Sequence, residues 1–199
     1  MTDSYTTLWS AERCRRIKQA HQVGAKLSLL FGGPHTSEPS FRRAGVKSGD
    51  YVYPIRIQDG ILSIIGRLRV REILPLEAYL TNYAHLFADC TRKNSIAWAE
   101  DLLDQYFAKH PEQRYLRYTC TEEVVLGEEG TAIRFDVAVP PELLTQIRFR
   151  SQRRERGIKY IENGKLRNVL SLQGIYRLTE QSSQQFEHLL LEHLSKAAG

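Results

Sequence analysis

One short stretch of the chain carries the side chains best suited to chemistry. Residues 148–159 contain five arginines, one lysine and one glutamate, which gives this segment a charge of +5. The whole protein of 199 residues has a formal net charge of +5, so the other residues are neutral on balance. Concentrated arginine produces a local positive field, and each guanidinium fits two oxygens of a phosphate or carboxylate. The segment therefore predicts an anionic partner.

Two other basic clusters would enlarge this surface if the fold brought them together. One follows residue 41, and the other lies on the first expected helix, with Arg13, Arg15, Arg16 and Lys18. A joined basic face most commonly binds nucleic acid, and six phosphate contacts would lower affinity roughly a thousandfold between 50 and 200 mM salt. The alternatives are ordinary surface charge and a face that docks an acidic protein. The basic residues expected to contact RNA or DNA are Arg42, Arg43, Lys47, Arg148, Arg150, Arg153, Arg154, Arg156 and Lys159.

Aromatic side chains could add base recognition to the charge. Tyr51 and Tyr53 alternate along one expected strand and therefore share a face. If that face is exposed, both rings could stack on a base, whereas an inward face would make them core residues. We expect Phe149, inside the basic run, to pack the segment against the protein.

Catalytic and metal-binding signatures are missing from the sequence. It contains no Cys-x-x-Cys pair, no phosphate-binding loop and no nucleophile motif. We expect a binding protein without metal or cofactor. The alternative is an enzyme acting on nucleosides or modified nucleic acid, in which a buried Lys26 with a lowered pKa meets Thr36 or Ser37 and Asp50 in a pocket.

The composition also indicates where the protein works. Its three cysteines are odd in number and widely spaced, which favours a reducing compartment and predicts a cytoplasmic protein. The chain has neither the basic, apolar start of a secretory signal nor an apolar run long enough to cross a bilayer, so we expect no membrane partner. The residues do not indicate an oligomeric state.

The elements that must position these residues follow from local signals. Ser10 should cap a helix over residues 11–22, and residues 26–31 read as a buried strand. The Gly- and Pro-rich segment 32–40 should be a loop beside a base-accepting pocket. Asp59-Gly60 predicts a hairpin between strands 51–57 and 61–70, with Pro54 at an edge or a bulge.

A second set of signals covers the rest of the chain. We expect helices at 76–87 and 95–109, a hairpin of strands 115–126 and 131–139 turning at 127–130, a short helix after Pro140, strands at 147–150 and 169–177, and a C-terminal helix from Thr179. Hairpins dominate, without βαβ alternation, so the fold class should be α+β. We expect one domain over residues 1–199, with a helical insertion around 76–110 and the C-terminal helix at 179–196.

Residues 41–70 resemble the core hairpin of PUA-like domains, which include the PUA, ASCH, EVE and YTH groups. The matching positions are the turn residues Gly49 and Asp50, and the return-strand pair Gly66 and Arg67. The resemblance implies a β pseudo-barrel of hairpins flanked by helices. It also implies recognition of RNA, or of DNA with modified bases, and adds Arg67 to the expected site.

One further signature bears on the ASCH group. Its Gly-x-Lys-x-x-Thr-x-Arg pattern begins well at Gly24 and Lys26, but Leu29 and Phe31 stand where threonine and arginine are expected. Lys26 alone is therefore carried over from that pattern as a site residue.

Overall fold

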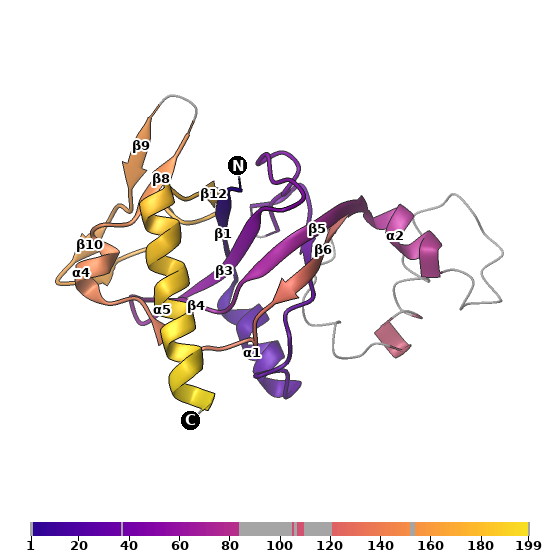
Figure 1. The fold of residues 1–199 in the computed structure, drawn as a ribbon, viewed down its shortest axis with the longest axis horizontal. Helices are drawn as coiled ribbons and strands as arrows, with labels where there is room; N and C mark the ends of the chain where they lie inside the picture. Colours follow the sequence, from indigo (N-terminus) through magenta and orange to yellow (C-terminus); the bar gives the residue numbers. More distant parts are fainter. Residues whose placement is uncertain are drawn as a thin grey trace.

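The computed structural model describes residues 2–36, 38–83, 105, 107–109, 121–151 and 154–198, and they form an α+β fold (Figure 1). The helices are α1 (Ala11–Gln19), α2 (Leu76–Tyr83), α4 (Pro141–Leu144) and α5 (Glu180–Ala198). The strands are β1 (Ser4–Leu8), β2 (Leu29–Gly32), β3 (Tyr51–Gln58), β4 (Ile61–Ile64), β5 (Leu68–Pro75), β6 (Glu123–Gly130), β7 (Val137–Ala138), β8 (Arg148–Arg150), β9 (Glu155–Gly157), β10 (Ile161–Glu162), β11 (Lys165–Leu166) and β12 (Ile175–Arg177).

The main sheet is mixed and branched. Its path runs β12-β1-β3-β5-β6-β2, and β4 branches from β3 to pair with β7. All these pairs are antiparallel except β1 with β3. The eight strands of this sheet leave it open rather than closed into a barrel, and β8–β9 and β10–β11 form two separate two-stranded sheets. The α+β prediction is therefore confirmed.

Strand β3 organises the sheet, and the hairpin expected at its end is present. Asp59 and Gly60 have positive φ values of 54° and 79°, as a two-residue hairpin turn requires, and Gln58 pairs with Ile61. The return strand is split into β4 and β5. Pro54 lies inside a central strand rather than at an edge. The alternative expectation of a bulge fits, because between the pairs Val52–Leu68 and Ile55–Ile64 two residues of β3 face three residues of the return strand. Because proline has no N–H, only its carbonyl is used at this point, accepting from Ile65 at 2.8 Å.

The hairpin predicted to turn at residues 127–130 is wrong, because β6 runs straight through them as a strand. Gly127 lies against Leu68, where an added Cβ would come within 2.0 Å of its side chain. A Cβ on Gly130 would lie 1.6 Å from the Leu27 carbonyl oxygen. These glycines are therefore present because neighbouring groups approach them closely, not because the chain turns.

Strand β1, which the sequence analysis missed, lies between β3 and β12. It pairs in parallel with β3 from Ser4 with Tyr51 to Leu8 with Ile55. Its other edge pairs with β12, where Tyr5 lies opposite Arg177. The expected strand at 169–177 is shortened to β12 alone. The first and last strands of the sheet are thus neighbours, although about 170 residues separate them.

Two hydrophobic clusters meet at β3. Val52 belongs to a cluster beneath α1, β2, β5 and β6, and Ile55 belongs to one formed with β4, β7, β8 and α5. Phe186 of α5 packs edge-on against Tyr53, with ring centroids 5.7 Å apart. Helix α5 begins as expected after Thr179, whose Oγ1 accepts the Ser182 N–H at 3.3 Å. No helix among the described residues is long and apolar enough to span a membrane.

Only the ends of the segment predicted as a helical insertion lie within the described residues. Helix α2 begins at Leu76, as expected, and is described to Tyr83. Most of the helix predicted over residues 95–109 lies outside the described residues. The first strand of the wrongly placed hairpin, at 115–126, is likewise described only from residue 121.

Candidate functional site

A strongly charged hollow in the described structure is a groove of about 800 Å³, called the basic groove here. It lies where the start of β1, the turn after residue 40 and the β8–β9 hairpin meet. Five cations and one carboxylate line it: Lys47, Arg150, Arg154, Arg156, Arg177 and Asp3. The aromatic residues Tyr5, Phe149 and Tyr176 also line it. Two basic clusters about 100 residues apart in sequence therefore meet in one site.

The first wall is the turn over residues 41–50, and two carboxylates fix it. Asp50 accepts the backbone N–H of Lys47 at 2.8 Å and that of Asp3 at 2.9 Å, which ties the turn to the start of β1. Glu123 of β6 accepts the backbone N–H of Phe41 and the Ser40 hydroxyl. Both carboxylates are buried, and ordered turns of this kind hold Lys47 in place at the groove.

The floor is the pair of strands β1 and β12. Their antiparallel register sets Tyr5 opposite Arg177. The Arg177 guanidinium forms an ion pair of 2.5 Å with Asp3. The Tyr5 hydroxyl donates to the carbonyl of Gly45 at 3.2 Å, which links the floor to the first wall. Burial, followed by the nearby carboxylates of Asp50 and Asp3, raises the pKa of Tyr5, so its hydroxyl keeps its proton.

The second wall is the β8–β9 hairpin, which is the most basic segment of the sequence. Phe149 and Arg156 are cross-strand partners. Phe149 is buried and packs on Tyr176 with centroids 5.5 Å apart, as expected for a packing role. The Arg156 guanidinium lies 4.1 Å from the Tyr176 ring centroid. This cation–π contact holds Arg156 at the groove.

The charge of this groove is largely uncompensated. Asp3 neutralises Arg177. Within the described part of the chain, no carboxylate forms an ion pair with Lys47, Arg150 or Arg154. All three side chains are exposed. Arg156 contacts aromatic rings rather than an acid. Four cations therefore remain available to an anion in a hollow that also offers aromatic surface.

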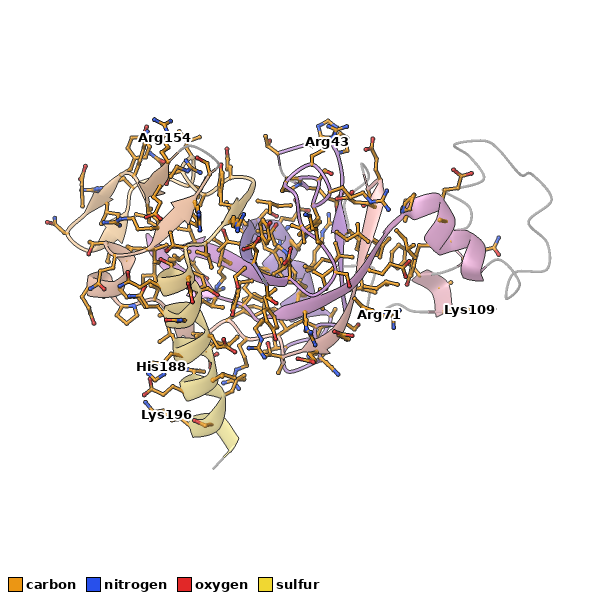
Figure 2. The ribbon with its side chains drawn as sticks, turned by 45° about the horizontal axis from the view of Figure 1, so that its top comes forward. Arg43, Arg71, Lys109, Arg154, His188 and Lys196 are labelled. Carbon is orange, nitrogen blue, oxygen red and sulfur yellow. The ribbon has the colours of Figure 1, made fainter. Side chains whose placement is uncertain are left out.

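Other predicted contact residues lie outside the groove. Arg43 is exposed on the same turn as Lys47, and Figure 2 shows Arg43 and Arg154 along the same edge of the molecule. Arg42 donates to the Ile73 carbonyl at 2.5 Å. Arg148 donates to the carbonyls of Thr145 and Ile147 at 2.7 and 3.0 Å. The two arginines that bind carbonyls thus hold the protein's own backbone.

Two predicted residues cannot be assigned to the groove. Lys159 is exposed on the segment between β9 and β10 and is not among the groove's lining residues. Arg153 lies outside the described residues, between the two strands of the β8–β9 hairpin.

The expected aromatic platform is corrected by the structure. Tyr53 is fully buried beneath α5, so it cannot stack on a base. Tyr51 is half-buried, and the Arg67 guanidinium covers its ring at 4.8 Å. Arg67 in turn forms an ion pair with Glu187 of α5. The shared face of these tyrosines therefore points inward, and Arg67 helps to fasten the helix over it.

The lysine pocket considered for catalysis is not assembled in the described residues. Lys26 is exposed, and its backbone bridges Ala132. Asp50 uses both carboxylate oxygens for backbone N–H groups. Ser37 lies outside the described residues, and Thr36 is exposed. Lys26 is therefore not the buried lysine that this alternative requires.

In the loop over residues 32–40, Glu38 turns inward, whereas Pro34, His35 and Thr36 are exposed. Glu38 is fully buried and forms an ion pair of 3.2 Å with Arg13, while Thr121 donates to its other oxygen at 2.9 Å. Arg13 is consequently buried and cannot belong to a surface cluster. Among the described residues, no three His, Cys, Asp or Glu side chains gather as a metal site would require.

Sequence reasoning missed four charged or aromatic lining residues: Asp3, Tyr5, Tyr176 and Arg177. Asp3 directly precedes β1, Tyr5 lies in β1, and the last two lie in β12. Each is an isolated residue in a short segment, so no cluster marks it. Only the pairing of β1 with β12 brings them together.

Comparison with known proteins adds no assignment. The chain matches no protein-family model, and no curated protein matches it significantly. The site must therefore be interpreted from its own chemistry.

Proposed function

We propose that the protein binds nucleic acid, RNA in preference to DNA, through the basic groove. The observation that carries the proposal is that Lys47 of one wall and Arg150, Arg154 and Arg156 of the other line a single hollow. Several guanidinium and ammonium groups in one hollow suit the repeated phosphates of a polynucleotide. The Asp3 carboxylate in the lining is paired with Arg177, and no metal-binding cluster is found in the residues described, so the proposed activity is binding.

The groove suits a single strand better than a duplex. Single-stranded nucleic acids are held by cations that follow the backbone and by planar groups on which bases stack. Arg156, fixed against Tyr176, presents a planar guanidinium, and bases stack on such planes as well as on aromatic rings. This arrangement takes the place of the base-accepting pocket that we expected beside residues 32–40.

The preference for RNA and for modified bases rests on the resemblance of residues 41–70 to PUA-like domains. The proposal includes a PUA-like arrangement of the strands around the core. Its support is the β3 hairpin with the Gly49-Asp50 turn before it, and the branching of β3 between β4 and β5. A cytoplasmic location remains part of the proposal, on the ground of the cysteine content.

Salt dependence of binding tests the proposal directly. Fluorescence anisotropy of a labelled oligouridylate should show log K falling against log salt with a slope of roughly −3, since four phosphate contacts each contribute about −0.7 on a single strand. Lys47→Glu and Arg154→Glu, on opposite walls, should each weaken binding about tenfold or more at low salt and reduce the slope by about one. A deoxyribonucleotide of the same sequence should bind more weakly.

A matched control uses a lysine far from the groove. Lys196 lies near the end of α5, at the opposite side of the molecule from Arg154 in Figure 2, and pairs with Glu192. Lys196→Glu changes the net charge by the same amount but should leave RNA binding intact. Equal losses in all three variants, or no binding at low salt, would refute the proposal. Retention of an acidic protein by the wild type in that case would favour the protein-docking alternative.

A further inference from the structure

Arg15 and Lys18, from the basic cluster on α1, line a separate cavity of about 360 Å³, called the α1 cavity here. It lies between α1 and the end of β3, and its lining residues are Ala11, Cys14, Arg15, Lys18, Arg56, Ile57 and Gln58. The basic groove adjoins the first residues of β1, which pair with the start of β3. At 3.3 Å per residue, the two sites are roughly 20 Å apart along the strand.

One part of the α1 cavity is positively charged. Arg15, Lys18 and Arg56 line it, and no carboxylate does. None of these three side chains forms an ion pair with a residue that the structure describes. The neighbouring Arg16, by contrast, pairs with Glu12 and is not part of the lining. The charge of Arg16 is thus paired within the protein, whereas the three lining cations remain available to a ligand.

Two of the three cations are held in place before any ligand binds. The Lys18 ammonium and the Arg56 guanidinium lie 4.9 and 4.8 Å from the ring centroid of Phe135. Arg56 also donates through Nη2 to the Phe135 carbonyl at 2.6 Å. Its buried Nε has no hydrogen-bond partner in the described part of the chain. Such fixed donors lose little conformational freedom when an anion binds.

The other part of the lining is apolar. Ala11, Cys14 and Ile57 contribute to it, and Cys14 is buried. Burial raises the pKa of Cys14 to about 11, so the side chain is a neutral thiol at physiological pH. A mainly apolar hollow with a few convergent polar groups is typical of small-molecule sites, and its volume lies in their usual range.

We propose that the α1 cavity binds a small phosphorylated molecule with an apolar body. Arg15, Lys18 and Arg56 hold the phosphate, and Cys14 and Ile57 contact the body. This site is independent of the basic groove, because the two share no lining residue.

Calorimetry with phenyl phosphate and the full chain tests this assignment. Phenyl phosphate should bind saturably at one site, and both phenol and inorganic phosphate should bind at least tenfold more weakly, since each lacks one part of the recognised structure. Lys18→Gln should weaken phenyl phosphate binding about tenfold, which is the usual scale for losing a charge-assisted hydrogen bond. Arg16→Gln, two residues before Lys18 on the same helix, should leave phenyl phosphate binding unchanged.

Further arms separate this site from the groove and from misfolding. Phenyl phosphate binding should survive in the Lys47→Glu/Arg154→Glu double variant, and RNA binding should survive in Lys18→Gln. Arg15 and Lys18 are exposed, so their variants should melt like the wild type, and Arg15→Gln repeats the test on a second cation. Absence of saturable binding at millimolar phenyl phosphate, equal loss in Arg16→Gln, or displacement of phenyl phosphate by oligouridylate would overturn the proposal.

Discussion

At the scale of single residues, the carboxylates near the basic groove act on the backbone rather than on a ligand. Asp50 and Glu123 both accept main-chain N–H groups of the turn over residues 41–50. A buried carboxylate is stable in this setting because its hydrogen bonds compensate for lost hydration. The acids therefore shape the wall that carries Lys47 and do not cancel its charge by direct pairing.

Removing the Glu123 charge should destabilise the protein. Glu123→Gln keeps the shape but weakens its bonds to the N–H of Phe41 and the hydroxyl of Ser40, and we expect a loss of about 1–3 kcal/mol. Urea unfolding followed by circular dichroism would measure it. Glu122→Gln is the matched control, since Glu122 is exposed and adjacent in sequence. Equal effects of the two substitutions would show that the buried hydrogen bonds contribute nothing.

Cys14 should titrate differently in the folded and unfolded chain. Its pKa is raised from 9.0 to about 11, chiefly by burial, so the folded protein holds the thiol proton more tightly. The associated stability is fully present below pH 9 and is lost as the pH rises toward 11. Near neutral pH, the lower thiolate fraction alone should slow alkylation on the order of a hundredfold relative to denatured protein.

Mass spectrometry of the tryptic peptide containing Cys14 would follow that alkylation across pH. The denatured chain serves as the reference for the same peptide. Identical pH profiles in the two states would show that burial does not shift this thiol.

At the scale of elements, Gly127 and Gly130 allow β6 to pack closely against β5 and the segment before β2. The Cβ of an alanine at Gly130 would lie 1.6 Å from the Leu27 carbonyl oxygen, so the backbone would have to move. We expect Gly130→Ala to lower the free energy of unfolding by about 3 kcal/mol or more, because close-packed backbone relaxes little. Thermal and urea denaturation would measure the loss.

Gly157→Ala in β9 is the comparison variant for this prediction. Its nearest neighbour is the flexible end of the Arg148 side chain at 3.1 Å, which can move aside. Its cost should stay within about 1 kcal/mol. If Gly130→Ala lowered the free energy of unfolding as little as Gly157→Ala, the close approach of β6 to the segment before β2 would be refuted.

Local signals predicted the elements that depend on neighbouring residues. Ser10 caps α1, with its Oγ accepting the Arg13 N–H at 3.1 Å, and Asp59-Gly60 turns the β3–β4 hairpin. Residues 127–130 misled the prediction, because glycine marks both turns and close contacts. The β1–β12 pairing was beyond local reasoning, because it joins short strands from opposite ends of the chain.

In the candidate site too, only the residues that cluster in the sequence were predictable. Sequence clustering identified Lys47 and the arginines of 150–156 as candidates for one surface, but it could not show which clusters the fold would join. Arg13 looked like surface charge and is buried against Glu38, whereas isolated Arg177 lies in the groove. Contacts between distant segments decide both cases.

At the scale of the whole molecule, strand β3 joins the two hydrophobic clusters, so we expect them to unfold together. Phe186→Ala removes a fully buried ring from the α5 cluster and should cost about 3–5 kcal/mol. Trp9 belongs to the other cluster. In a Trp98→Phe background, Trp9 fluorescence and circular dichroism should therefore shift to the same lower midpoint. An unchanged fluorescence midpoint would indicate two independent units.

The position of Asp3 at the floor of the groove has a practical consequence for handling this protein. Any peptide attached ahead of that residue would emerge beside the proposed RNA site, close enough to obstruct it or, if it were acidic, to occupy it. An extension placed after α5 would leave from the opposite side of the molecule (Figure 1). Purification tags for the binding experiments therefore belong at the carboxyl end.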